Sequence, residues 1–79
     1  MTRAPRGVSA RRFIRALEQD GFELRRVRGS HRIYGHTDGR RVVVAYHGLN
    51  DTFPIGTLRG MIADVGWTEQ DLQRLELID

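Results

Sequence analysis

Among the residues of this sequence, His31 has the surroundings best suited to chemistry. It directly follows Gly29 and Ser30, at the start of an expected strand. An imidazole titrates near neutral pH and can both remove and return a proton, which is what cleavage of RNA by its own ribose hydroxyl requires. Gly29 would let a phosphate backbone approach closely, and Ser30 would donate a hydrogen bond to it. His31 is therefore a candidate general base or acid, although any surface histidine in a basic domain would meet the same description.

Basic and aromatic side chains surround this segment. Arg26, Arg28 and Arg32 lie within five positions of His31, so a phosphate beside the imidazole would meet positive charge as it becomes pentavalent. Tyr34 is a candidate for stacking on a base, although aromatic strand residues more often pack in a core. The predicted RNA-binding residues are Arg26, Arg28, Gly29, Ser30, Arg32 and Tyr34.

A metal site fits these residues less well. His31 and His36 lie five apart on one expected strand and therefore face opposite sides, and no pair of acids stands beside them at ligand spacing. A histidine combined with Asp38 or Asp51 is a formal alternative. We expect no metal and no other cofactor in the site.

Positive charge is concentrated in the first half of the chain. All 13 basic residues are arginine; residues 1–46 hold eleven of them against four acids, whereas residues 47–79 hold two against six. A guanidinium grips phosphate with two hydrogen bonds and stacks on bases, so the first half suits a polyanion such as nucleic acid. A solvated basic face is the alternative interpretation.

Length and composition restrict the class of protein. A chain of 79 residues suffices for one domain with a thin core. There is no cysteine, which excludes disulfide scaffolds, thiolate zinc sites and cysteine nucleophiles, and we expect a cytoplasmic protein. No stretch approaches the roughly 20 apolar residues that span a bilayer, so neither membrane insertion nor secretion is predicted.

The helices that must position these residues follow from the spacing of apolar side chains. Residues 1–8 lack any periodicity and are expected to form a flexible basic arm, followed by a single domain over residues 9–79. Ser9 suits a helix N-cap, and an apolar stripe predicts a helix over about residues 10–20 that ends at Gly21. A second stripe predicts a helix over about residues 55–65. Thr68 and the residues after it predict a short C-terminal helix.

Three strands are expected between the two longer helices, over about residues 22–28, 31–36 and 41–46. Gly29 and Ser30 separate the first two, and Asp38 with Gly39 supplies the positive φ that a tight hairpin needs. This order predicts an α+β domain in which the helices cover one face of an antiparallel sheet. The other face is left for another role. Double-stranded-RNA-binding domains share the order α-β-β-β-α.

Several segments together resemble the HicA toxins. They are Gly21-Phe22-Glu23-Leu24, Gly29-Ser30-His31-Arg32-Ile33-Tyr34, the turn Asp38-Gly39-Arg40-Arg41 leading into Val42-Val43-Val44, and the run from Gly56-Thr57-Leu58-Arg59 to Gly66. The match covers about residues 9–75. The order and spacing of these segments are specific as a set, although each segment alone is weak.

The resemblance implies a double-stranded-RNA-binding-like fold with a short C-terminal helix, and a toxin that cleaves messenger RNA. It implies that the histidine of the Gly-Ser-His segment, His31, is catalytic, and that a HicB-like antitoxin neutralises the toxin. The alternatives are a module of the same fold that binds structured RNA without cutting it, and a module that contacts DNA or docks on a protein.

Overall fold

The computed structural model describes residues 5–78. The elements follow in the order α1 (Ala10–Gln19), β1 (Glu23–Arg28), β2 (His31–Gly35), β3 (Arg41–Ala45), α2 (Ile55–Val65) and α3 (Glu69–Arg74). This order confirms the predicted α+β class with its short final helix. Among the described residues, no helix is long and apolar enough to cross a membrane.

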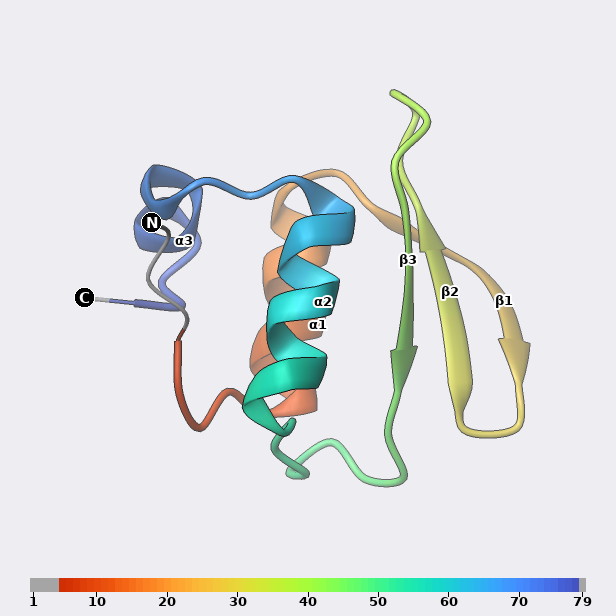
Figure 1. The fold of residues 1–79 in the computed structure, drawn as a ribbon. Coiled ribbons are helices and arrows are strands. Elements are labelled where there is room, and N and C mark those ends of the chain that lie inside the picture. The colour runs from red at the N-terminus through yellow and green to blue at the C-terminus, as the bar shows by residue number, and fades with distance from the viewer. Residues whose placement is uncertain (1–4, 79) are drawn as a thin grey trace.

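The strands form one antiparallel sheet in the order β1-β2-β3, and the helices cover only one of its faces (Figure 1). Tyr34 of β2 and Val42 and Val44 of β3 are buried beneath the helices. Because side chains alternate along a strand, the residues between them point the other way. We call this uncovered side the open face; it carries His31, Ile33 and Gly35 of β2, Arg41, Val43 and Ala45 of β3, and Arg26 and Arg28 of β1.

A β-bulge interrupts the first strand pair. Leu24 pairs with Tyr34 and Arg26 pairs with Ile33, so Arg25 is the extra residue between them. A bulge of this kind re-aims a side chain. Arg25 accordingly lies across Gly35, where an added Cβ would be 3.2 Å from the Arg25 Cγ. The bulge therefore places both Arg25 and Arg26 on the open face.

The helix ends follow the predicted signals. The Ser9 side chain accepts a hydrogen bond from the Arg12 backbone N–H at 3.2 Å, which begins α1. Gly66, with φ of 69°, ends α2 in the left-handed conformation. The Thr68 side chain and Asp71 form a reciprocal capping box at the start of α3. These caps satisfy backbone groups that helix termini leave unpaired.

The core lies between the helical layer and the covered face of the sheet. Its largest fully buried side chains are Phe13, Leu17, Leu58, Leu72, Val8, Val42, Val44 and Val65. The Phe13 ring contacts those of Phe53 and Trp67, with centroids 5.8 and 5.4 Å away. Trp67, two residues after α2, thus anchors the C-terminal segment on the core.

The core begins earlier in the chain than the sequence indicates. Val8 is fully buried, and its carbonyl accepts a hydrogen bond from the Phe53 backbone N–H at 3.3 Å. The predicted arm over residues 1–8 therefore does not include Val8, which packs as part of the domain. A single apolar residue between Gly7 and Ser9 carries no periodic signal. Residues 1–4 of the predicted arm lie outside the described residues.

Asp20, at the C-terminal end of α1, joins segments that are distant in the sequence. Its carboxylate accepts hydrogen bonds from Trp67 Nε1 at 2.8 Å, Arg40 Nη1 at 3.1 Å and Arg74 Nη2 at 3.0 Å. Burial raises the pKa of the Asp20 carboxyl, but these three donors outweigh it and the pKa is lowered. The carboxylate therefore ties α1 to the β2–β3 hairpin, to Trp67 just beyond α2, and to α3.

Candidate nucleic-acid interface

His31 is the first residue of the central strand and is exposed. In the sheet register it lies between Arg28 of β1 and Ala45 of β3. Tyr34 of the same strand points into the core, so alternation directs His31 to the open face. The imidazole is therefore accessible to a large ligand that approaches the uncovered side of the sheet.

Four of the six predicted RNA-binding residues lie beside His31. Arg28 is its direct cross-strand partner, and Arg26 is one pair further along the same face, opposite Ile33. Gly29 and Ser30 form the two-residue turn between the Arg28–His31 pair. Gly29 has φ of 59°, and a Cβ added to it would have no atom within 4 Å, so this turn is open to solvent.

The other two predicted residues, Arg32 and Tyr34, lie on the covered side. The Arg32 guanidinium lies over the Tyr46 ring, 4.1 Å from its centroid, and donates hydrogen bonds to the Ser30 and Tyr46 carbonyls at 3.3 and 3.4 Å. Tyr34 is 5% exposed, and burial raises the pKa of its hydroxyl. The structure therefore does not bring these two residues to the face of His31, because side chains alternate along β2 and Arg32 and Tyr34 point away from it.

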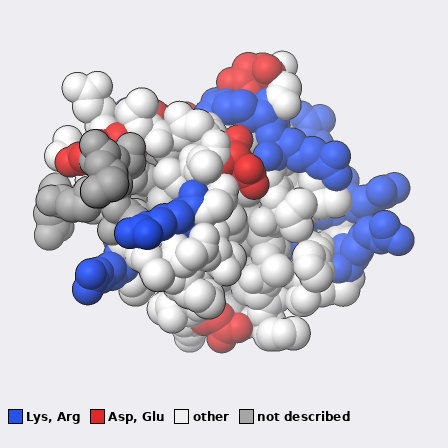
Figure 2. All heavy atoms as spheres, in the orientation of Figure 1, with Lys and Arg blue, Asp and Glu red and all other residues white. Residues whose placement is uncertain are grey.

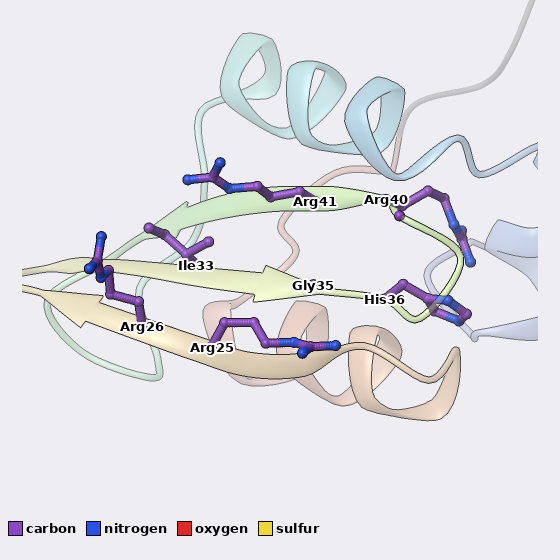
Figure 3. Close-up of a pocket in the computed structure, with 8 residues that line it drawn as sticks. Arg25, Arg26, Ile33, Gly35, His36, Arg40 and Arg41 are labelled. Carbon is purple, nitrogen blue, oxygen red and sulfur yellow. The ribbon is translucent and has the colours of Figure 1, made fainter.

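Two arginines outside the predicted set complete the open face. Arg41 begins β3 opposite Gly35, and Arg25 reaches the same region through the bulge. A shallow groove of about 450 Å³ lies there. Figure 3 shows Arg25 and Arg26 on one side of the Ile33–Gly35 backbone and Arg41 on the other. The sequence could have placed Arg41 on the open face, because it is adjacent to Val42, which is expected to be buried. It could not have placed Arg25 there, because a bulge leaves no simple pattern in the sequence.

The electrostatic character of this side follows from those arginines. Figure 2 shows arginine atoms gathered along the right-hand side of the molecule, which the sheet occupies in the same view of Figure 1. Within residues 5–78, Arg26, Arg28 and Arg41 take part in no side-chain ion pair or hydrogen bond. Their charges are therefore free for an anionic ligand.

The remaining histidines have other surroundings. His36 Nε2 lies 2.8 Å from the Asp20 carbonyl oxygen, while Nδ1 accepts from the Asp38 backbone N–H at 3.1 Å. Its ring also packs edge-on against Phe22 at 5.1 Å, so His36 holds the β2–β3 hairpin on α1. His47 is exposed in the loop after β3. Within residues 5–78, no three His, Asp or Glu side chains are grouped as metal ligands would be.

These features can serve acid–base chemistry on a phosphate. Directly paired residues of neighbouring strands have Cβ atoms roughly 5 Å apart, so the Arg28 guanidinium can reach a phosphate that contacts the His31 imidazole. The fold is that of a small α+β domain with the topology of double-stranded-RNA-binding domains. One face of its sheet is basic and is not covered by helices.

The comparison with protein families gives the assignment. A sequence model described as the HicA toxin of bacterial toxin–antitoxin systems matches residues 10–67 of the 79-residue chain. The chain belongs to the HicA toxin family, and its role is that of a toxin in a toxin–antitoxin system. The matched range contains every element from α1 to α2, including the whole sheet. No curated protein sequence matches the chain.

Proposed function

We propose that this toxin is a metal-independent endoribonuclease that cleaves messenger RNA in the cytoplasm, with His31 as general base or acid. The observation that carries the proposal is the placement of His31: it is exposed on the open face and stands directly opposite Arg28. A histidine that packed in the core or faced only apolar side chains would not support catalysis. The family assignment supports the same function.

In the proposed reaction the ribose 2′-oxygen attacks the neighbouring phosphorus, and the bond from phosphorus to the 5′-oxygen breaks. The imidazole accepts the proton of the 2′-hydroxyl or supplies the proton that the leaving 5′-oxygen takes up. Arg28 stabilises the negative charge of the pentavalent phosphate, Arg26 binds the RNA backbone beside it, and the Gly29–Ser30 turn admits that backbone. The products are a 2′,3′-cyclic phosphate and a 5′-hydroxyl.

Neutralisation by a HicB-like antitoxin belongs to the same proposal. An antitoxin that covers the open face would exclude RNA from His31. The exposed arginines there favour a partner with complementary negative charge. The contact is thus expected to weaken as the salt concentration rises, because salt screens exposed charges.

The test compares induced expression of the wild type, His31→Ala and His47→Ala. His47→Ala is the matched control, since it removes an exposed histidine that lies outside the β-strands. We expect growth arrest and RNA cleavage from the wild type and the control, and loss of both with His31→Ala. All three proteins must be folded and equally abundant.

Two results would contradict this proposal. Equal cleavage by His31→Ala would show that another residue is the catalyst. Binding of RNA by the wild type without any cleavage would favour the alternative of an RNA-binding module with the same fold. Mass analysis of the fragments gives a separate check, because the proposed reaction leaves a cyclic phosphate terminus.

A further inference from the structure

The groove on the open face lies along β2 beyond His31, toward the β2–β3 turn. Its floor is formed by Ile33 and Gly35, the next two residues of β2 that share a face with His31. At about 3.3 Å of rise per residue, these positions lie about 7 and 13 Å along the strand from His31. The groove therefore lies on the same face as the proposed catalytic residue, at a distance that suits a neighbouring phosphate rather than the phosphate at His31.

The arginines around this groove are of two kinds. Arg40 is occupied within the fold, because its guanidinium donates to the Asp20 and Asp38 carboxylates and to the Val65 carbonyl. Arg26 and Arg41, in contrast, make no ion pair with any residue in the range 5–78. They lie opposite Ile33 and Gly35, on the two sides of the central strand.

Arg25 is the third arginine of the groove, and the position of its side chain depends on Gly35. Its chain lies so close to Gly35 that a Cβ at that position would be 3.2 Å from both Cγ and Nε of Arg25. Its ion pair with Glu23 measures 4.0 Å and is exposed, so it is weak. The absence of a side chain at position 35 lets this arginine lie flat over the sheet, toward the groove (Figure 3).

We propose that this groove is a second phosphate-binding subsite, in which Arg25, Arg26 and Arg41 hold the backbone of single-stranded RNA next to the nucleotide cleaved at His31. The proposal rests on the proposed function. It extends the RNA-binding surface from the His31–Arg28 pair to a series of residues along the sheet. Guanidinium groups on both sides of a shallow floor suit a linear polyanion, and the side chain of Ile33 offers an apolar surface to a ribose or base.

The shape of the surface favours one strand over a duplex. Arg26 and Arg41 stand on the strands that flank β2, which are separated by about 10 Å. Double-stranded-RNA-binding domains contact two successive minor grooves over about 16 base pairs. The groove in this chain occupies one end of the open face. The spacing of the arginines therefore fits a single backbone.

The experiment measures binding of a short single-stranded RNA whose 2′-hydroxyls are all methylated, so that the proposed reaction cannot occur. Fluorescence anisotropy gives the dissociation constant over a range of salt concentrations for the wild type, Arg26→Gln, Arg41→Gln and the double variant. Arg15→Gln is the control, because Arg15 is an exposed arginine on α1, in the helical layer. Circular dichroism confirms the fold of each variant.

We expect Arg26→Gln and Arg41→Gln each to weaken binding and to reduce the slope of log K against log salt by about 0.7, the value for one phosphate on a single strand. The double variant should lose about twice as much. Arg15→Gln should leave the slope unchanged. A duplex of the same sequence should compete poorly with the single strand.

Three results separate this inference from the proposed function. If Arg26→Gln and Arg41→Gln behave as Arg15→Gln while the wild type cleaves unmodified RNA, the subsite is wrong and the ribonuclease stands. If those variants bind RNA normally but lose affinity for the antitoxin, the groove is a protein interface and the subsite is equally wrong. If they weaken RNA binding although the wild type cleaves nothing, the subsite is supported and the catalytic proposal fails.

Discussion

Arg28 and His31 face each other across the first hairpin, as the last residue of β1 and the first of β2, and both are exposed. Because Gly29 and Ser30 close the turn between them, their relative position is fixed by backbone geometry alone. Substitution of Arg28 by Gln should therefore leave the fold intact. We expect it to lower the rate of RNA cleavage about 10- to 100-fold, since one charged donor to the transition state is lost.

The measurement for Arg28→Gln is the single-turnover cleavage rate, together with a thermal melt. A normal rate would contradict a role for Arg28 at the phosphate. A lower rate accompanied by a lower melting temperature would point to damage of the hairpin.

Arg32 should behave in the opposite way. Its guanidinium packs over Tyr46 and bonds two backbone carbonyls on the covered side of the sheet. Arg32→Ala should lower the free energy of unfolding by about 1–3 kcal/mol through loss of the cation–π contact and the hydrogen bonds. RNA affinity should change little in the folded fraction. Urea denaturation checks the first point, and a strong loss of RNA affinity in fully folded protein would contradict the second.

The Asp20 carboxylate makes the free energy of unfolding depend on pH. Its pKa is lowered in the folded protein, so between that value and the unfolded value of about 3.9 the unfolded chain binds more protons. The stabilisation is therefore complete above the unfolded pKa and is lost as the pH falls through the folded pKa. We expect Asp20→Asn to cost about 2 kcal/mol at pH 7.

The difference between the wild type and Asp20→Asn should shrink below about pH 4. Urea titrations at several pH values, followed by the fluorescence of the single tryptophan, Trp67, measure it. A difference that stays constant down to about pH 2 would show that the carboxylate charge does not contribute.

Substitution by alanine at two glycines should change the free energy of unfolding in opposite directions. Gly21 has φ of 94°, and a Cβ added there would lie 2.9 Å from His36 Nε2, which also contacts the Asp20 carbonyl. Gly21→Ala should therefore destabilise the protein by about 1–3 kcal/mol. Gly60 lies within α2, where an added Cβ would have no atom within 4 Å, so Gly60→Ala should stabilise it by about 0.5–1 kcal/mol. Thermal melts of both variants test the pair, and equal shifts would contradict it.

Local patterns were sufficient to predict the elements, because each has strong signals of its own. Ser9 caps α1, Gly66 ends α2 and Thr68 begins α3 as their positions indicate. The turn residues between the strands also lie where expected. The contribution of Val8 to the core was missed, since a lone apolar residue has no period to reveal it.

Which side chains share a face with His31 was harder to predict than where the strands begin and end. His31 and Arg28 are brought together by a two-residue turn that the sequence shows directly. Proximity in sequence was misleading for Arg32, because adjacent strand residues occupy opposite faces. Arg25 reaches the open face only through a bulge, whose position depends on how β1 pairs with β2 rather than on β1 itself. Such features belong to the assembled sheet.

The contacts of Asp20 also bear on when the core can close during synthesis of the chain. Its partners Trp67 and Arg74 lie 47 and 54 residues further along the chain, so they leave the ribosome long after α1. The sheet alone covers neither of its faces, and α2 and α3 must therefore arrive before the nascent chain has a closed core. The core can therefore close only after the segment that holds α3 has left the ribosome, however early α1 and the sheet are made.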